Sequence, residues 1–401
     1  MLKVVSTEKA LEIIKEEFSH MKAQTETVIL SESIGRTLSD DILSEENIPA
    51  FNRSTVDGFA VRAKDTYGSS ESVPSQLEIT GEILMGEKAE TKLGEGECIR
   101  ISTGGMLPEN ADSVVMVEHT DCTFPPVCLI LKAVSPFENV TKKGDDTRKG
   151  DVVFKKGKVI SSREAGVLAS LGRSKVPVAS KPRVGIISTG DEIVSIEGDI
   201  PFGKIRDINT HILSALINEL GCISKEYGII RDNYDDIYNS VKKAVSENDI
   251  VLISGGSSAG ARDMTAEIIG TLGELYLHGI AMKPGKPTIV GKIDQKAVFG
   301  LPGHPAAAYF VTLRLVKPLI DAILGRDSTD RTVTGSLTQN ISSNHGREEL
   351  LCVKLTADGV TPVFGKSGII SLLSESDGYI IIDRNCEGLK QGDEVHVILW
   401  S

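Results

Sequence analysis

"RVGIISTGDE" at residues 183–192 and "DIVLISGG" at residues 249–256 share the pattern that decides the fold. Each begins as an almost continuous apolar run and carries glycine where the run ends. A strand that is apolar on both faces is buried on both sides, which is typical of a parallel sheet covered by helices. Helical segments alternate with such strands along this part of the chain. Residues 177–326 therefore predict a central, mostly parallel α/β/α sandwich.

The segments that flank this central section have a different pattern of apolar and turn residues. The residues before it contain short strand-like runs separated by glycine and proline turns, which predict an inserted β-rich domain. The N-terminal segment is predicted to be largely helical, and a compact helix begins after Ser161, which has capping-box spacing to Glu164. Short strands return near the C-terminus and predict a small β-barrel. The predicted domains are a helical/linker domain at 1–45 plus 146–176, the β-rich insertion at 46–145, the α/β domain at 177–326 and the barrel at 327–401.

The composition of the chain narrows the classes of function. It has 401 residues, enough for several domains, and no apolar run reaches the ~18 residues that cross a bilayer. A net charge of −12 with only 4% aromatic residues argues against a nucleic-acid surface. The six cysteines are scattered, so neither a zinc site nor a disulfide framework is predicted. A soluble protein of the reducing cytoplasm fits best.

Three loops of the central section follow predicted strands, at 188–192, 254–263 and 300–305. In open parallel sheets, ligands bind outside the carboxyl ends of the strands. One glycine-rich loop is more often a turn than a ligand site. Three such loops favour a site, and their backbone N–H groups suit a phosphate. The predicted cofactor-binding residues of these loops are Ser188, Thr189, Gly190, Asp191, Gly255, Gly256, Ser257, Ser258, Gly260 and Gly303.

The second loop nearly matches a P-loop. Gly255 and Gly260 have the right spacing, but Ala261 and Arg262 stand where a lysine and a magnesium-binding hydroxyl are needed. A Walker-type nucleotide hydrolase is therefore not predicted. The loop is interpreted as a different kind of phosphate cradle.

Charged residues accompany these loops. Lys283 and Lys286 flank a Pro-Gly turn and offer counter-charges for an anion in an acidic chain. Taken singly, each of the nearby carboxylates is better explained as a turn or cap residue. Clustered beside a phosphate, they imply Mg²⁺, a cation that bridges carboxylate and phosphate oxygens. They could also hold a polar substrate by its hydroxyl groups or position a water molecule. These carboxylates are Asp191, Glu192, Asp232 and Asp263.

Two motifs stand out in the β-rich section, "FNRSTVDGFAVR" at 51–62 and "IRISTGGMLPENADSVVMVEH" at 99–119. Asp57-Gly58 is typical of a hairpin turn, and "STGG" in the second motif is typical of an ordinary loop. Their residue types alone assign no chemistry to either motif.

Taken together, the motifs resemble one family. "RSTVDGFAVR", "RISTGG", "ADSVVMVE", "STGDE", "GIIRDN", "SGGSSAGARD", "MKPGKP" and "GLPGHP" occur in this order. With this spacing the chain resembles the molybdopterin molybdenumtransferases, the MoeA family, which includes the C-terminal domain of gephyrin. The resemblance runs from about residue 5 to the C-terminus. It implies an enzyme that inserts molybdate into adenylylated molybdopterin with release of AMP, and that depends on Mg²⁺.

The resemblance also implies roles for individual residues. Catalytic roles fall on Asp57, Thr103, Glu192, Asp232, Asp263, Lys283 and Lys286. Cofactor binding extends from the loop residues above to Pro302, Pro305, Ser367 and an anion-binding Arg347. The implied metal ligands are Asp146, Glu192 and Asp263.

Several positions depart from the family pattern. His304 stands where asparagine is usual, Asp145 replaces glutamate, Thr141 stands where arginine is common, and "ESDG" at 375–378 replaces Ala-Asp-Gly. None of these changes removes a carboxylate that we consider essential, so the predicted activity is kept. Molybdate and tungstate are near-isosteric tetrahedral oxyanions, and both fit the prediction.

The resemblance further implies an assembly. The family forms elongated two-fold homodimers, in which Asp57 and Thr103 of one chain would reach the central loops of the other chain. A separate molybdopterin adenylyltransferase would supply the substrate. No nucleic-acid or membrane partner is expected.

Three other functions stay open at this point. The central section alone resembles the competence-damage proteins, which hydrolyse nucleotide pyrophosphates, but that function leaves "RSTVDGFAVR" and the C-terminal section unexplained. The molybdopterin adenylyltransferases share the central fold and lack the flanking sections. Gephyrin shows that the same architecture can serve as a scaffold.

Overall fold

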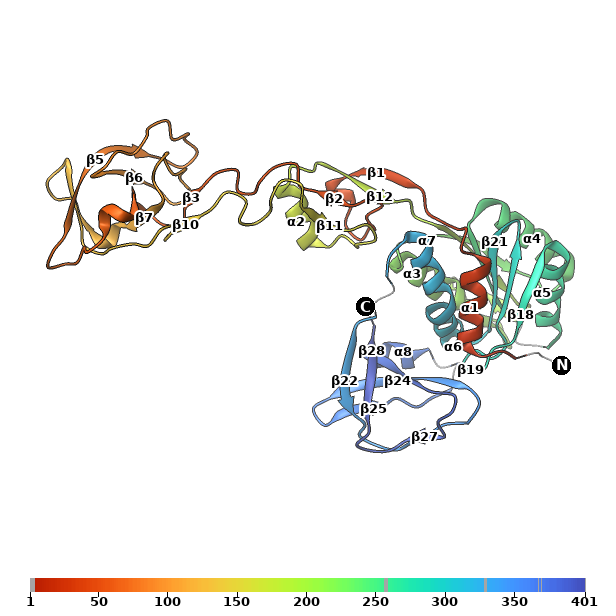
Figure 1. The fold of residues 1–401 in the computed structure, drawn as a ribbon. Coiled ribbons are helices and arrows are strands. Elements are labelled where there is room, and N and C mark those ends of the chain that lie inside the picture. The colour runs from red at the N-terminus through yellow and green to blue at the C-terminus, as the bar shows by residue number, and fades with distance from the viewer. Residues whose placement is uncertain (1–3, 256–258, 328–329, 367, 369, 401) are drawn as a thin grey trace.

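The computed structural model describes residues 4–255, 259–327, 330–366, 368 and 370–400. The molecule is elongated (Figure 1): a central α/β body and a C-terminal β-domain lie at one end, and a long arm extends away from them to a second β-domain. Within the described residues, no helix is long and apolar enough to cross a membrane. The elongated shape decides which motifs can meet inside one chain.

The body is built on a six-stranded sheet with the order β16-β13-β17-β21-β20-β18. β20 runs opposite to its two neighbours and the other described strands share one direction, so the sheet is mostly parallel, as the sequence predicts. Its strands are β13 (Arg183–Thr189), β16 (Ile223–Ile230), β17 (Ile250–Gly255), β18 (Glu274–His278), β20 (Ile289–Ile293) and β21 (Lys296–Leu301). Two short strands, β14 (Ile193–Val194) and β15 (Ile205–Arg206), pair with each other.

Helices cover both faces of this sheet (Figure 1). Val184 and Ile186 belong to the core shared with α1, α3, α6 and α7, whereas Ile187 belongs to the core shared with α4 and α5. All three side chains are fully buried, which explains the unbroken apolar run of β13. The helices are α1 (Thr7–Glu17), α3 (Asn209–Glu219), α4 (Tyr234–Glu247), α5 (Ala259–Leu272), α6 (Pro305–Val311) and α7 (Lys317–Leu324), with a π-helical turn η4 (Thr312–Val316) between the last two.

The N-terminal segment differs from the sequence prediction. A largely helical segment up to about residue 45 is wrong beyond Glu17: "TETVI" at 25–29 is rich in β-branched side chains, which favour a strand. In addition, Ala10 and Ile14 of α1 are buried in the core of the body and not in the linker. The segment after α1 contains β1 (Thr25–Ile29), a 3-10 turn η1 (Leu30–Glu32) and β2 (Ile42–Leu43).

At the root of the arm, the segment that leaves the body pairs with the segment that returns to it. β1 pairs antiparallel with β12 (Lys175–Ala179), and β2 pairs with β11 (Val152–Phe154). α2 (Ser162–Ser170) contributes Leu168 to a small core in this region. The capping box predicted for Ser161 and Glu164 is confirmed at the start of α2.

The outer end of the arm is a six-stranded sheet with the order β7-β4-β6-β5-β9-β8. Two apolar clusters pack on this sheet. Cys122 and Cys128 form a local disulfide there, a pairing that the sequence does not predict. The elements of this domain are β3 (Arg53–Ser54), β4 (Gly58–Val61), η2 (Ala63–Thr66), β5 (Ser75–Ile83), β6 (Glu97–Ile101), β7 (Ser113–Met116), η3 (Val117–His119), β8 (Thr120–Asp121), β9 (Val127–Ile130) and β10 (Val140–Thr141).

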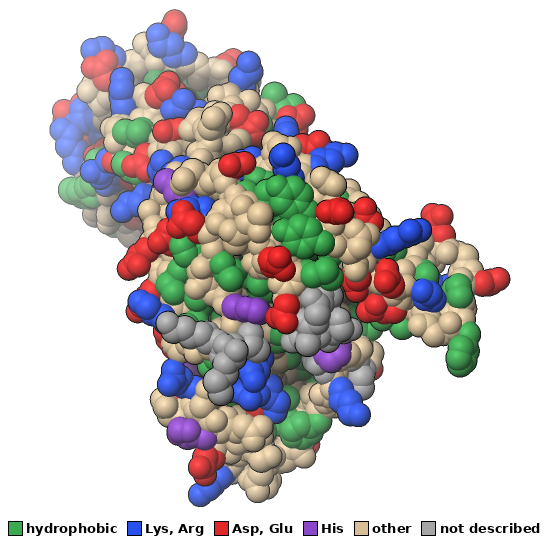
Figure 2. Space-filling view, turned by 90° about the vertical axis from the view of Figure 1, so that its right-hand side faces the viewer, with side chains coloured by type: hydrophobic (Ala, Val, Ile, Leu, Met, Phe, Trp, Pro, Cys, Tyr) green, Lys and Arg blue, Asp and Glu red, His purple; other side chains and the backbone are tan. Residues whose placement is uncertain are grey.

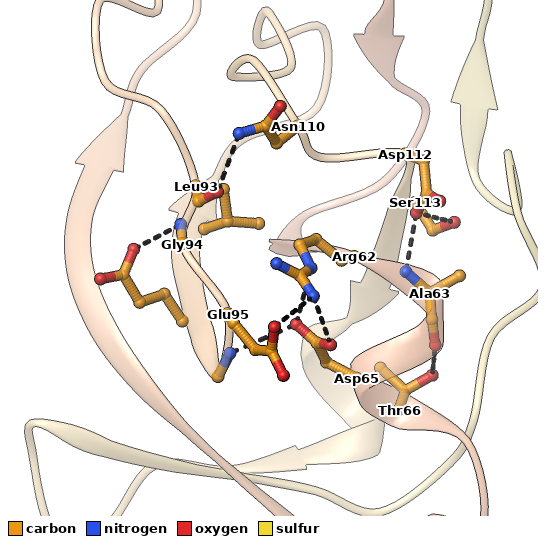
Figure 3. A network of polar contacts seen from close by, with 12 residues as sticks. Arg62, Ala63, Asp65, Thr66, Leu93, Gly94, Glu95, Asn110, Asp112 and Ser113 are labelled. Carbon is orange, nitrogen blue, oxygen red and sulfur yellow. Dashed lines mark hydrogen bonds and ion pairs between the residues drawn. The ribbon is translucent and has the colours of Figure 1, made fainter.

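The end of the motif "FNRSTVDGFAVR" has a structural role in this domain (Figure 3). Arg62 Nη2 donates to Asp65 Oδ1 at 3.2 Å and also reaches Glu95, so the start of η2 is tied to the neighbouring loop. Asp57-Gly58 is not the predicted hairpin turn, since β3 pairs with β10 while β4 pairs with β6 and β7. Glycine is required for a different reason: a Cβ on Gly58 would lie 1.9 Å from the Val115 carbonyl oxygen.

The C-terminal domain is a sheet that nearly closes on itself. Its order is β19-β24-β26-β28-β22, and β25 pairs with β24. A bridge between Leu337, which follows β22, and Val360 of β25 brings these two strands together. β19 (Met282–Lys283) lies in the segment that forms the body, so this sheet contains strands from both domains and joins them. The other elements are β22 (Thr332–Ser336), β23 (Ile341–Ser342), β24 (Glu348–Thr356), β25 (Gly359–Pro362), α8 (Ser371–Glu375), β26 (Gly378–Ile382), β27 (Gly388–Leu389) and β28 (Glu394–Leu399).

Candidate functional site

The three loops predicted to bind a ligand meet at one edge of the central sheet. β13, β17 and β21 are neighbours and parallel; Thr189 lies opposite Gly255, and Ser254 lies opposite Leu301. Gly255 has a φ of 148°, and a Cβ there would lie 2.2 Å from the Thr189 carbonyl oxygen, so this close approach requires glycine.

The predicted cofactor-binding residues at this edge fall into two groups. The structure brings together Ser188, Thr189, Gly190, Asp191, Gly255, Pro302 and Gly303. Gly260 lies in α5, which follows β17, and Pro305 is the first residue of α6. Gly256, Ser257 and Ser258 lie outside the described residues, as does Ser367.

Asn209 links two of these loops, and the sequence does not predict this role. Its Nδ2 donates to Ser254 Oγ at 2.7 Å and to the Gly303 carbonyl oxygen at 2.9 Å. Its Oδ1 is buried and has no hydrogen-bond partner among the described residues. An unpaired buried acceptor costs free energy, so this oxygen marks a position for a ligand donor or a cation. In the sequence, Asn209 is only the start of a helix, where asparagine is common.

Asp191, Glu192 and Asp232 form an acidic cluster at the same edge. The Asp232 N–H donates to Asp191 Oδ1 at 3.3 Å. Burial raises the pKa of Asp232, and the charges of Glu192 and Asp191 raise it further. In the part of the chain that the structure describes, Asp232 Oδ1 is buried without a hydrogen-bond partner. A nearby cation, or a proton, would stabilise this carboxyl group.

The carboxylates at this edge fit a particular kind of metal site. Asp263 is exposed and lies in α5. The described residues contain no group of three or more His, Cys, Asp or Glu arranged to hold a metal ion. Mg²⁺ is often held by one or two carboxylates, with phosphate and water completing its shell. An Mg²⁺ ion shared with a bound phosphate would need only one or two of these carboxylates as ligands.

A second part of the candidate site is a cavity of about 670 Å³ between the body and the C-terminal domain. Its lining joins Lys283, Lys286 and Pro302 of the body to Arg347 of the C-terminal domain. The pairing of β19 with β24 brings these distant segments together. Figure 2 shows basic side chains gathered between the body and the domain below it.

The lining of this cavity includes charged residues that the sequence did not assign to the site. Lys366 adds a fourth cation, and Glu349 and His304 also line the cavity. In a molecule with a net charge of −12, a local group of four cations favours an anionic ligand. The signal in the sequence was weak, because Lys366 and Glu349 are far from the glycine-rich loops and meet them only through the fold.

Other predicted residues lie in the arm, away from this site (Figure 1). Thr103 donates to Asp57 Oδ1 through its backbone N–H at 2.7 Å and its hydroxyl at 3.0 Å. These two hydrogen bonds lower the pKa of Asp57. Asp146 is exposed and follows β10 in the arm. Within one chain, the structure does not bring Asp57, Thr103 or Asp146 to the edge of the central sheet.

Comparison with family models covers most of the chain. Residues 5–172 match the MoeA N-terminal region (domain I and II), residues 185–322 match a probable molybdopterin binding domain, and residues 334–400 match the MoeA C-terminal region (domain IV). The matches follow one another in chain order and include both the arm and the C-terminal domain.

Individual relatives are similar over nearly their whole length. The chain is 36% identical to a molybdopterin biosynthesis protein of Methanocaldococcus jannaschii, over 100% of this chain and 98% of the relative. It is 33% identical to a molybdopterin molybdenumtransferase of Staphylococcus epidermidis, over 98% of this chain and 95% of the relative. A crystal structure of a molybdopterin biosynthesis MoeA protein from Pyrococcus horikoshii has 32% identity, covers 99% of this chain and 100% of its own, and superposes with a TM-score of 0.89.

Proposed function

The chain belongs to the MoeA family of molybdenum cofactor biosynthesis, and from that premise we propose that it inserts molybdate into adenylylated molybdopterin and releases AMP. One observation carries the proposal. Phosphate-suited loops, an acidic cluster and a cationic cavity are all built from segments at or beside one edge of the central sheet. A reaction that joins an oxyanion to a phosphorylated substrate needs these three environments together.

The cationic cavity is proposed to hold the oxyanion. Molybdate is a tetrahedral dianion, and Lys286 and Arg347 can offer it charge-assisted hydrogen bonds. The mixed lining of the cavity, with Pro302 and Phe310 beside the cations, would shield these interactions from water and strengthen them. The protein would thus position the oxyanion before the substrate's sulfur atoms accept the metal.

The glycine-rich edge is proposed to bind the phosphate groups of the substrate. The Gly190 N–H already donates to the Ile230 carbonyl oxygen, so the backbone N–H of Asp191, just beyond the strand, is the group proposed to donate to a phosphate oxygen without requiring a positive side chain. Mg²⁺ held by Glu192 and Asp263 would neutralise the phosphate charge and favour the departure of AMP. The raised pKa of Asp232 also suits it to hold a proton during this step.

We further propose that the complete site is shared by two chains. Asp57 and Thr103 are paired at the end of the arm, where their own body is out of reach (Figure 1). A second chain related by a two-fold axis can bring its arm to the central edge, because an isologous dimer repeats the same contact twice. Asp146, at the base of the outer domain, would approach the acidic cluster in the same way.

The experiment that tests the proposed reaction is an assay of AMP release. The protein is incubated with adenylylated molybdopterin and Mg²⁺, with molybdate, with tungstate, or with no added oxyanion. Release that requires an oxyanion is expected, because the cavity is built for a second anion. Equal release without oxyanion would contradict metal insertion and support a nucleotide pyrophosphatase. Comparison of the assay with molybdate and the assay with tungstate determines the metal preference.

A further inference from the structure

The cavity between the body and the C-terminal domain contains a charge that the proposed oxyanion binding does not explain. Among the described residues that line it, Glu349 is the one carboxylate, beside Lys283, Lys286, Arg347 and Lys366. A negative charge opposes the binding of any anion nearby. Burial of an unpaired charge costs free energy, so the groups that contact Glu349 indicate why this charge is kept.

Glu349 is held in place by the sheet and by two polar contacts. The parallel pairing of β19 with β24 places Lys283 opposite Glu349. Lys283 Nζ lies 2.7 Å from Glu349 Oε1, and Ser343 Oγ donates to Glu349 Oε2 at 2.7 Å. The side chain of Glu349 is only 11% exposed, whereas that of Lys283 is 45% exposed. The carboxylate therefore fixes one side of the ammonium group, whose other N–H donors stay available to a ligand.

The other cations of the cavity differ from Lys283 in their contacts. Lys286, Arg347 and Lys366 form no ion pair with any residue that the structure describes. The cavity thus offers three unpaired cations and a fourth cation whose charge is offset by Glu349. Removal of the Glu349 charge would leave four uncompensated cations and a stronger attraction for a dianion.

We propose that Glu349 is a positioning residue for the oxyanion: it orients Lys283 and limits the positive charge of the cavity, so that the oxyanion binds weakly enough to be transferred. The identity of the oxyanion rests on the proposed function. Tight binding of the starting oxyanion would stabilise the ground state without stabilising the transition state, and the transfer step would slow. Glu349 thereby favours turnover over affinity.

The test replaces the charge and keeps the shape. Glu349→Gln retains an acceptor oxygen for Lys283 but is neutral. Calorimetric titration of the full chain with molybdate, and separately with sulfate as an inert tetrahedral dianion, is expected to show roughly tenfold tighter binding at low salt. The gain should shrink at high salt. In the AMP-release assay, both KM for molybdate and kcat are expected to fall.

A matched control is available on the same strand. Glu348 is the neighbouring residue, is similarly buried, and pairs with Arg314 at 2.9 Å instead of with Lys283. Adjacent strand residues point to opposite faces, so Glu348→Gln should leave the affinity for oxyanions unchanged. In a Lys283→Gln background, Glu349→Gln should change the affinity less than it does in the wild-type chain, because the two side chains act as a pair.

The outcomes separate this inference from the proposed function. An unchanged or weaker affinity of folded Glu349→Gln for both oxyanions would overturn the role of Glu349, whatever the assay of AMP shows. If the wild-type chain releases no AMP, the proposed function fails while the titrations still test Glu349. If Glu349→Gln does not fold, Glu349→Asp provides the test instead. Its shorter side chain keeps the charge but moves it away from Lys283. A lower kcat with near wild-type oxyanion affinity is then expected, and a wild-type kcat would overturn the inference.

Discussion

At the scale of single residues, Asp232 lies in an environment that lowers the stability of the folded protein. Its carboxyl group is partly buried near Asp191 and Glu192, and its pKa is raised. The ionised form is therefore less stable in the folded protein than in the unfolded chain. Such an arrangement is typical of a group that is kept for binding or proton transfer.

This reasoning predicts the behaviour of Asp232→Asn. A raised pKa means that the folded state loses stability as pH rises from the ordinary pKa of 3.8 through the folded value, and that the loss persists above it. The neutral variant lacks this loss. Its melting temperature should exceed that of the wild type at pH 7, and the difference should vanish as pH falls below the ordinary pKa of 3.8. AMP release should fall at least tenfold. A variant that is less stable at pH 7, or as active as the wild type, would rule out this assignment.

Asp263→Asn tests the carboxylate in α5. The structure removes the alternative of a helix cap, because Asp263 is the fifth residue of α5 and not its first. Asparagine keeps the size of the side chain but loses the charge available to Mg²⁺. We expect kcat to fall at least ~100-fold, the scale of one lost electrostatic contact, with little change in melting temperature. Turnover close to that of the wild type would show that Asp263 has no part in the site.

Sequence reasoning found the site residues that lie in motifs at strand ends, because the carboxyl edge of a parallel sheet collects its loops. Thr189 and Gly255 are of this kind. It missed Asn209, Glu349 and Lys366, whose importance depends on contacts with distant segments. An isolated asparagine or glutamate in the sequence carries no sign of the partner that it meets in the fold.

At the scale of elements, local signals were reliable where they did not compete with tertiary structure. The capping box of α2 was predicted from two residues, and it is present. The helical prediction for residues 1–45 failed after α1, where the chain pairs with strands from residues 152–179. Strand pairing between segments more than 100 residues apart leaves only a weak local trace, so its partner cannot be read from the segment alone.

The capping box also gives a prediction. The Ser161 hydroxyl is the main cause that lowers the pKa of Glu164 to about 2, so this carboxylate stabilises the fold above the ordinary glutamate pKa and loses its effect as pH falls toward 2. Ser161→Ala should destabilise the start of α2 by about 1 kcal/mol and speed amide hydrogen exchange across residues 162–170 at pH 7. Ser162→Ala, one residue later and exposed, is the matched control. Equal exchange in both variants would mean that the cap contributes nothing.

At the scale of the whole molecule, the arm is the feature that most needs an explanation. It holds the Asp57–Thr103 pair away from the loops of its own body (Figure 1). The family resemblance implies this separation. The direction of an arm depends on a few contacts at its root, such as the pairing of β1 with β12, and these leave no periodic signal in the sequence.

The most direct measurement of the central claim, that two chains build each site, uses two inactive variants in one dimer. Asp57→Asn and Asp263→Asn chains with different tags are co-expressed, and the doubly tagged dimer is purified. One of its sites receives both substitutions and the other receives neither, so AMP release should recover to about half of the wild-type rate, or about a quarter in an unsorted mixture. Each variant alone should remain inactive. A purified mixed dimer that is as inactive as its parents, or a chain that stays monomeric, would contradict the shared site.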